Sequence, residues 1–468
     1  MSGRVVIIGG GISGATTAYD ILRRRPDAEV VLLERDEALG GTARAEVSPE
    51  GYTVDWGPNG FLTNVPHSLD LAVELGLAER LQPASDLARF RFIFKDEQLK
   101  PLPLGPGDFL ASDFVSWPGK LRMALEPFIA TPEDHRRETV HGFAARRLGE
   151  EFAQAFMHPM ILGITSGDSA NTNLDALFPR MRALEVEHGS LVAAMVSRVL
   201  ERQRSAANGA EAEEEGGGPA GPGGRLTSFG PGGVQVLLDA LGERLGDRVR
   251  LASPVARVEP GRRGGWSVAL ADNDERVEAD AVVLATPSYT AARLVEGRSP
   301  QLAEALDAIP YASVRVLALG FDPGAIPGRM DGFGFLVPRG QGVRILGCLW
   351  TSTIFPSQAP HDKVLLRIIA GGVFDPGFVD LSDEEALWEA RRDLSRTMRI
   401  TEPPEFVRQI RWRDAIPQYG PEHLDRVARI DQLLQPGLFV TGNAYKGLGL
   451  NDCVKNARLT AEAVVESL

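Results

Sequence analysis

The chain has 468 residues, enough for about three structural units at roughly 150 residues per domain. Hydrophobic residues make up 43% and charged residues 24% of it, which is typical of globular proteins and excludes a disordered or fibrous chain. The 50 basic and 63 acidic residues give a formal net charge of −13, which argues against nucleic acid as a partner because phosphate backbones bind cationic surfaces.

Cysteine content and the start of the chain limit its compartment and its metal chemistry. Cys348 and Cys453 are the two cysteines, too few for a disulfide framework or a four-thiolate metal site. No histidines share a ligand-like spacing, so we expect no metal. The apolar run Val5–Ile8 is too short for a signal-peptide core, and no stretch approaches the roughly 18 apolar residues of a membrane span. We therefore predict a cytoplasmic protein.

The first 35 residues predict a strand, a helix and a second strand, a βαβ start. Between the first strand and the helix stands a G-x-G-x-x-G motif: Gly9, Gly10, Gly11, Ile12, Ser13 and Gly14. Its glycines let backbone N–H groups approach a pyrophosphate, and an acidic residue after the second strand, here Glu34, accepts hydrogen bonds from ribose. We predict a dinucleotide site; a glycine-rich turn without a nucleotide is the alternative.

The motif alone does not decide between NAD and FAD. A second glycine pair, Gly40 and Gly41, follows Glu34, and Arg35 and Arg44 beside it can meet phosphate charge. This second pair is typical of proteins of the flavin amine oxidase type, and it favours FAD.

The sequence pattern changes along the rest of the chain. Helical spacing with few strand signals runs over 106–204, and 205–224 has no apolar residue larger than alanine, which predicts a mobile surface loop. Strands are predicted at Val249–Val258, Val314–Phe321, Gly332–Val337, Val343–Leu349 and Val364–Ile369, the last four in an antiparallel sheet. A last strand and the helix Asp452–Ser467 close the chain, so the nucleotide region is predicted to be discontinuous.

Two longer motifs carry a family resemblance. Asp55-Trp-Gly-Pro-Asn-Gly-Phe61 and Gly442-Asn-Ala-Tyr-Lys-Gly-Leu-Gly-Leu-Asn-Asp-Cys453 resemble signatures of the oxygen-dependent porphyrinogen oxidases, a branch of the flavin amine oxidase superfamily. Gly163–Asp168 is similar to the family's G-x-x-A-G-D stretch, with Ser166 in place of alanine, and Trp412, Pro417 and Tyr419 complete a W-x4-P-x-Y pattern. Thr42 stands where many amine oxidases have arginine, which sets the chain apart from a generic amine oxidase.

The resemblance implies an α/β (α+β overall) fold of three parts. A Rossmann-like FAD-binding domain would comprise 1–84, 226–292 and 420–468. A mixed-sheet substrate domain would comprise 85–105, 188–225 and 293–419, and a helical, membrane-associating domain 106–187.

The implied activity is the six-electron oxidation of protoporphyrinogen IX to protoporphyrin IX, with hydride passing to the flavin and molecular oxygen forming hydrogen peroxide. FAD carries the chemistry, so no acid or base residue is required. Coproporphyrinogen III is the second candidate substrate, and amine or carotenoid oxidation on the same fold comes third. A nucleotide-binding protein without redox turnover is the alternative from another class.

The resemblance also assigns site residues. Arg91 would bind substrate carboxylates, Phe333, Leu336 and Leu349 would pack against the rings, and Gly163 would leave room beside them; taken alone, these residues would be an exposed strand arginine and ordinary core. Asn59 would lie near the flavin and the reacting pyrroles, or serve only as a turn residue. The flavin would also contact Gly57, Pro58, Val255, Trp412, Gly447, Leu448 and Gly449, together with the motif residues named above, Glu34, Arg35, Gly40 and Gly41. Asp452 is as easily a helix cap.

Partners beyond substrate and oxygen are also expected. The span 89–147 has 10 basic and 8 acidic residues and includes Trp117–Met123, which favours peripheral contact with the inner face of the cell membrane. A solvated helical face is the alternative. A homodimer completes these expectations.

Overall fold

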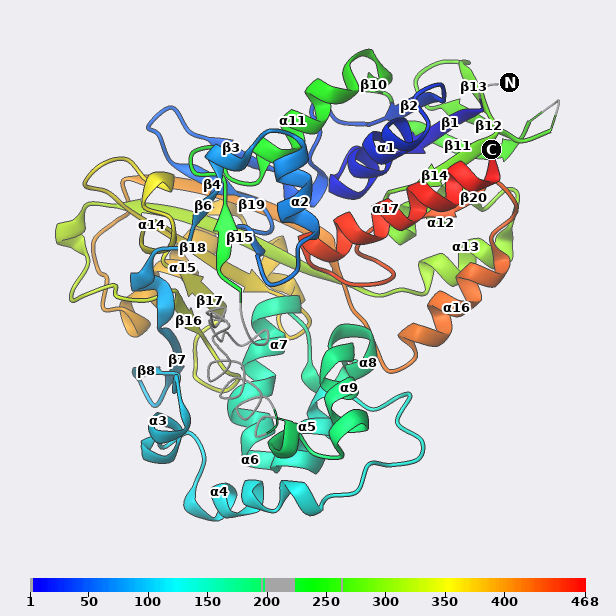
Figure 1. Ribbon diagram of the computed structural model, residues 1–468. Helices are drawn as coiled ribbons and strands as arrows, with labels where there is room; N and C mark the ends of the chain where they lie inside the picture. Colours follow the sequence, from blue (N-terminus) through cyan, green and yellow to red (C-terminus); the bar gives the residue numbers. More distant parts are fainter. Residues whose placement is uncertain (1–2, 195–196, 198–223, 262–263) are drawn as a thin grey trace, which may run out of the picture.

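The computed structural model describes residues 3–194, 197, 224–261 and 264–468. The segment 205–224, predicted to be a mobile loop, lies outside this set apart from Gly224. Figure 1 shows a helix-covered sheet beside both chain ends, a second and larger sheet, and a group of short helices below the larger sheet.

A parallel sheet in the order β10-β2-β1-β14-β20 organises the part that holds both termini. Its strands are β1 (Arg4–Ile8), β2 (Glu29–Leu33), β10 (Val249–Arg250), β14 (Ala281–Leu284) and β20 (Leu438–Val440). Three distant stretches of sequence therefore form one sheet. The single strand predicted over Val249–Val258 is wrong: the chain leaves the sheet after Arg250, because Ala252 has a φ of 47° and Pro254 has no N–H to donate.

Both faces of this sheet are covered, which is why β1 and β2 are apolar after their first residue and β14 is apolar throughout. Val5 and Ile7 pack against helices, and Val6 and Ile8 pack against the opposite layer. The first layer contains α1 (Ile12–Arg24), α11 (Gln235–Leu245) and α17 (Leu450–Ser467), with α2 (His67–Glu74) against α17. The second contains the antiparallel strands β11 (Val255–Pro260), β12 (Trp266–Leu270) and β13 (Arg276–Ala279), with α12 (Ser288–Val295), α13 (Pro300–Asp307) and α16 (His423–Leu433).

The second sheet has seven strands in the order β19-β15-β18-β17-β16-β7-β8. They are β19 (Phe406–Pro417), β15 (Tyr311–Phe321), β18 (Val364–Gly371), β17 (Ile345–Leu349), β16 (Gly334–Leu336), β7 (Arg91–Lys95) and β8 (Gln98–Pro101). The four strands predicted for an antiparallel sheet are all present, but β16 pairs with β7 in parallel. The sheet is therefore mixed, as the predicted fold class requires.

The two faces of this sheet differ. Phe94, Phe335 and Cys348 point to the outer face, where α15 (Asp383–Thr397) packs. Arg91, Leu336 and the register partners of Arg91 share the inner face, as the alternation predicted. The hairpin β3 (Ala45–Val47) and β4 (Thr53–Asp55) covers part of this inner face. Beside it lie α14 (Thr351–Ile354) and a small sheet of β5 (Phe61–Leu62), β9 (Leu226–Ser228) and β6 (Gln82–Pro83).

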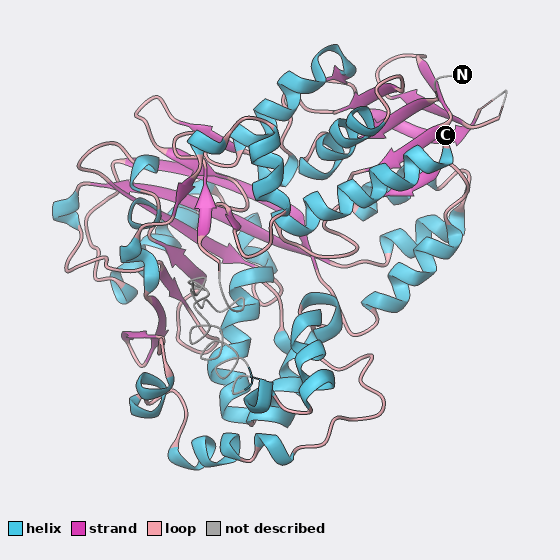
Figure 2. Cartoon of the chain, viewed as in Figure 1, coloured by secondary structure: helices cyan, strands magenta, loops and turns pink. Residues whose placement is uncertain are grey.

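Short helices form the third part, as Figure 2 shows. They are α3 (Pro106–Ala111), α4 (Trp117–Ala124), α5 (Val140–Leu148), α6 (Glu150–Phe152), α7 (His158–Thr165), α8 (Leu174–Leu177) and α9 (Pro179–His188). Among the described residues, none of the helices combines the length and hydrophobicity that crossing a bilayer needs. Ser190, Leu191 and Val192 bond to Glu126, so this stretch packs on the helices, whereas the predicted boundaries placed it in the substrate domain.

Candidate functional site

In the first glycine loop, one glycine allows close packing and another borders open space. Gly11 caps α1 without a side-chain bond, so N–H groups of the first helical turn lie free at its N-terminus. A methyl group on Gly14 would lie 2.0 Å from the Gly9 carbonyl oxygen, whereas one on Gly11 would meet nothing closer than the Gly40 oxygen at 3.9 Å. Gly14 therefore lets the helix pack, and Gly11 leaves a cradle with a positive helix end that suits a pyrophosphate.

Glu34 and the second glycine pair close around this loop. The Gly40 N–H donates to the Gly10 carbonyl at 3.0 Å, which sets the two glycine loops side by side. The Glu34 carboxylate, 7% exposed, accepts the N–H of Gly10 at 2.5 Å and that of Asp36 at 2.9 Å. Ile12 and Ser13 are buried behind the loop, Gly41 is exposed beside it, and Arg35 is exposed and pairs with Asp36 at 3.6 Å.

Val255 lies near the same acidic residue. The N–H groups of Ala252 and Ser253 donate to the carbonyls of Asp36 and Glu34 at 2.9 and 2.8 Å. Val255 follows two residues later, half-buried at the start of β11. The fold thus brings Val255 close to Glu34, and its predicted contact with the cofactor stays a prediction.

The turn Gly57-Pro58-Asn59 lies between the second glycine loop and the larger sheet. A methyl group on Gly57 would lie 1.9 Å from the Thr42 oxygen, so this turn presses on the second glycine loop. From the larger sheet, the Trp412 Nε1 donates to the Trp56 carbonyl at 2.9 Å. Pro58 and Asn59 are half-buried. Trp412 therefore reaches this turn through the backbone of Trp56.

The C-terminal turn is pinned by Tyr419. Its hydroxyl donates to the Asn443 carbonyl at 2.6 Å and accepts the Gly447 N–H at 2.9 Å. Gly449 is the N-cap of α17, and the Asp452 carboxylate accepts its N–H at 3.2 Å, which is the capping role considered for Asp452. Leu448 is half-buried between them. Tyr419 appeared in a sequence motif, but its role in shaping this turn did not.

The predicted substrate residues meet on the inner face of the larger sheet. Arg91, Gly334, Leu349 and Arg367 are consecutive register partners across β7, β16, β17 and β18. From the opposite side, α7 brings Gly163 against Leu336: a methyl group on Gly163 would lie 2.7 Å from Leu336 Cδ2. Phe333 and Leu349 pack in one cluster. These apolar side chains are only half-buried, unlike those on the outer face.

Arg91 is a cation without a counter-charge. Its guanidinium lies 4.8 Å from the centre of the Phe333 ring, and burial lowers the pKa of Arg91 from its usual value. No carboxylate of the described residues forms an ion pair with it. A half-buried arginine beside an aromatic ring is suited to bind a carboxylate from outside the chain.

Two residues that sequence reasoning missed lie between the glycine loops and this face. Arg367, 5% exposed, donates from Nη2 to the Gly57 carbonyl. Asp55 is 1% exposed, and burial raises its pKa to about 6. The signal for Arg367 was available, because it stands in the apolar strand Val364–Gly371, where a charged residue needs a reason.

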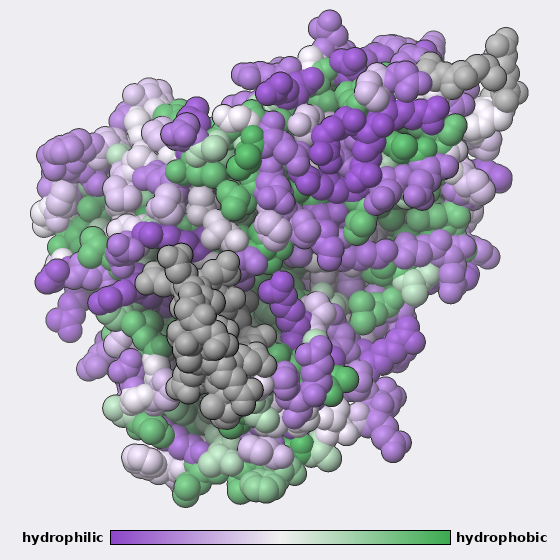
Figure 3. Space-filling view, in the orientation of Figure 1, coloured by the Kyte–Doolittle hydropathy of each residue, from purple (hydrophilic) through white to green (hydrophobic). Residues whose placement is uncertain are grey.

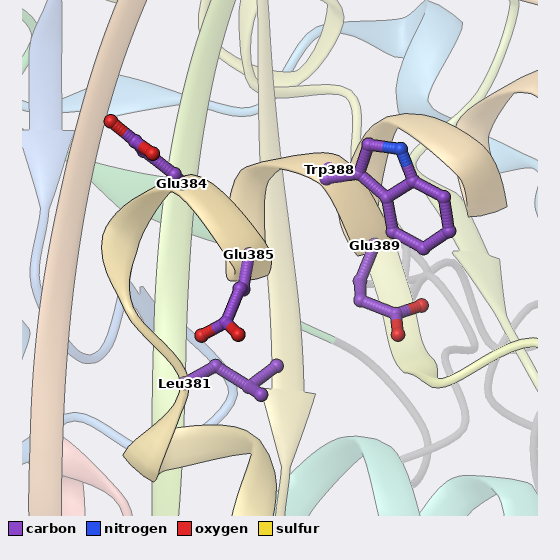
Figure 4. Close-up of a pocket in the computed structure, with 5 residues that line it drawn as sticks. All are labelled: Leu381, Glu384, Glu385, Trp388 and Glu389. Carbon is purple, nitrogen blue, oxygen red and sulfur yellow. The ribbon is translucent and has the colours of Figure 1, made fainter.

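Other surface features do not form part of this site. A hollow on α15 is lined by Leu381, Glu384, Glu385, Trp388 and Glu389 (Figure 4). Glu385 closes the capping box with Ser382, and Glu389 pairs with Arg344 at 3.0 Å, so these carboxylates are engaged in structure. Across the described parts of the chain, no three histidine, cysteine or acidic side chains are grouped to hold a metal ion.

Comparison with known proteins shows which family has this arrangement. Residues 12–465 match the family model of the flavin-containing amine oxidoreductases. The chloroplastic protoporphyrinogen oxidase of Oryza sativa subsp. japonica is 31% identical over 100% of this chain and 89% of its own length. The coproporphyrinogen III oxidase of Bacillus subtilis is 28% identical over 97% of this chain and 96% of its own length. The crystal structure of a protein from Exiguobacterium sp. 255-15 carries the name protoporphyrinogen oxidase. It superposes on this chain with a TM-score of 0.83 at 25% identity, and the superposition covers all of both chains.

The fold and the paired glycine loops define a flavoprotein oxidoreductase. The chain belongs to the family of flavin-containing amine oxidoreductases, and its cofactor is FAD. The open cradle at Gly11, the free N-terminus of α1 and the buried Glu34 carboxylate fit the pyrophosphate and ribose of that cofactor.

Proposed function

We propose that this protein oxidises a porphyrinogen to the corresponding porphyrin. Protoporphyrinogen IX is the first candidate substrate and coproporphyrinogen III the second, since full-length relatives carry each name. Bound FAD supplies the hydride acceptor, and we propose molecular oxygen as the final acceptor, with hydrogen peroxide as its product. The protein's own residues bind the macrocycle, orient it and exclude water.

The unpaired Arg91 is the observation that carries the proposal. A porphyrinogen is a broad apolar ring with carboxylates on its rim, so it needs an apolar wall and a cation at the edge. The inner face supplies half-buried Phe333, Leu336 and Leu349, with Arg91 in the same register row as Leu349. Gly163 keeps α7 close to Leu336 without filling the space.

Side-by-side turnover of the two porphyrinogens tests this proposal. We expect growth of porphyrin fluorescence with formation of peroxide, and the faster substrate identifies the preferred ring. Arg91→Met should raise the KM for that substrate by about tenfold or more, the loss of one charge-assisted hydrogen bond of roughly 1.5–3 kcal/mol. Arg89→Met is the matched control, because Arg89 is exposed two residues away and stacks on Phe90. Turnover of neither porphyrinogen would refute the proposal.

We also propose that the helical part rests on the inner face of the cell membrane, in the cytoplasm. Trp117, Leu121, Leu125 and Phe128 recur at helical spacing along α4 and the turn after it, and they are 67%, 68%, 54% and 84% exposed. Figure 3 shows apolar surface at this lower end of the molecule. An exposed apolar stripe of this kind suits insertion at a lipid headgroup boundary.

Vesicle sedimentation tests the membrane proposal. The holoenzyme should sediment with vesicles of anionic phospholipid, and Trp117→Asp should release it. Trp388→Asp is the matched control, because Trp388 is 61% exposed on α15 in another part of the molecule. Equal release by the two variants, or no sedimentation of the native protein, would contradict the proposal.

The homodimer stays a prediction, which the elution volume of the native protein in size-exclusion chromatography tests.

A further inference from the structure

Arg367 is a buried cation with few partners. It lies in the middle of β18 and is 5% exposed. In the described part of the chain its hydrogen bond runs from Nη2 to the Gly57 carbonyl, and its Nε has no partner. Burial lowers the pKa of Arg367. Such a group is costly to keep in a strand where an apolar residue would pack well.

The charge that balances Arg367 comes from the β3–β4 hairpin that covers part of the inner face of the larger sheet. Asp55, at the end of β4, is the acid whose field acts on Arg367, and burial raises the pKa of its carboxyl to about 6. Asp55 is itself loosely held: it accepts the Val234 N–H and the Gln358 amide, each at 3.4 Å. The opposite oxygen of the Gln358 amide has no partner. These groups do not form a closed structural network.

The position of Arg367 connects two functional surfaces. Among the residues that the structure describes, its hydrogen bond as a donor goes to the turn that contains Pro58 and Asn59, which presses on the second glycine loop through Gly57. On the strand itself, Arg367 is the direct register partner of Leu349, a residue of the proposed substrate wall. A shift of the guanidinium would therefore move the flavin-side turn relative to the substrate-side sheet.

We propose that Arg367 is a positioning residue that holds the Gly57–Asn59 turn against the substrate sheet and thereby sets the alignment of flavin and substrate. Trp412 supports the same turn by its bond to the Trp56 carbonyl. The inference rests on the proposed assignment of this turn to the flavin.

The test compares two buried arginines of one sheet in the FAD-loaded enzyme. Arg367→Met should lower the reduction potential of the flavin, because a nearby positive charge is lost, and should shift its visible absorbance. It should lower kcat about a hundredfold with little change in KM, since misplacement of about 1 Å costs that much. Arg315→Met is the matched control. Arg315 is fully buried in β15 but bonds to Asp383 and the Ser382 carbonyl on the outer face, so it should lower the melting temperature alone.

Arg367→Lys keeps the charge but loses the planar guanidinium fork, so it should keep most of the flavin potential and still lower kcat, and it carries the test if Arg367→Met does not fold. A flavin potential, spectrum and kcat like those of the native enzyme in both Arg367 variants would overturn the inference. The potential and the spectrum are measured without substrate, so they remain decisive even if the chain does not oxidise porphyrinogens.

Discussion

Two buried charged clusters of this protein differ in how completely they are bonded. In the helical part, Arg147 is fully buried and uses Nε, Nη1 and Nη2 on Glu185, Glu126, Thr131 and two carbonyls. At the junction of the two sheets, Arg367 leaves Nε without a partner. The closed network stabilises the fold, whereas the open one at Arg367 lies against the turn that we assign to the flavin.

Removing the central cation of the closed network should have the largest effect. Arg147→Met leaves the buried Glu126 and Glu185 short of a counter-charge, so we expect the free energy of unfolding to fall by about 3–5 kcal/mol. Denaturant titration measures it. The exposed Arg136, paired with Asp425 at 2.8 Å, is the control, and its change to Met should cost less than about 1 kcal/mol. Similar losses for both would erase the contrast between the clusters.

A buried histidine at the start of α16 should make stability depend on pH. His423 is fully buried, its Nε2–H donates to the Tyr445 carbonyl at 2.9 Å, and its Nδ1 has no partner. Burial lowers its pKa to about 4, so between pH 6.5 and 4 the unfolded chain binds a proton that the folded chain does not. Stability should fall on acidification over this window by roughly 3 kcal/mol from this group.

Unfolding titrations at several pH values measure this contribution. His423→Gln should flatten the slope over the window, while the same change at His361, 94% exposed in its side chain, should leave the native slope. If His423→Gln leaves the slope of stability against pH unchanged, then burial does not hold His423 neutral.

Two buried tyrosines at the C-terminal turn repeat the comparison of a bonded and an unbonded buried group, with smaller expected effects on stability. Tyr419→Phe leaves the Asn443 carbonyl and the Gly447 N–H unpaired, which should cost about 1–3 kcal/mol and weaken FAD retention. The Tyr445 hydroxyl is buried and has no hydrogen-bond partner among the described residues, so Tyr445→Phe should be neutral or slightly stabilising. Melting temperature and the flavin-to-protein absorbance ratio report both effects. Equal losses in the two variants would contradict the role given to the Tyr419 hydroxyl.

The smallest effect on stability should accompany a complete loss of cofactor. Gly11 has a φ of −72°, which alanine adopts freely, and a methyl group there meets open space. Gly11→Ala should therefore fold with nearly native stability and purify without yellow colour. Gly14→Ala, whose methyl group would strike the Gly9 carbonyl, should fail to fold well. A yellow Gly11→Ala protein would refute the cradle.

The sequence by itself determined the features that depend on local physics. The glycine spacing between a strand and a helix, the acidic residue after β2 and the alternation around Arg91 each predict their own geometry within a few residues. The long motifs at Asp55–Phe61 and Gly442–Cys453 carried the family. The break between Arg250 and Val255 was missed, although Pro254, which has no N–H to donate, is a local signal for it.

Only the tertiary structure decided which distant groups meet. Arg367 stands 310 residues from Gly57, and Tyr419, two residues after the end of β19, bonds to the turn at Asn443 and Gly447. A periodic sequence pattern cannot predict such contacts, because they depend on how two sheets pack against each other. Whether a buried charge is fully bonded, as at Arg147, or left open, as at Arg367, follows from that docking, and this difference directs attention to the junction.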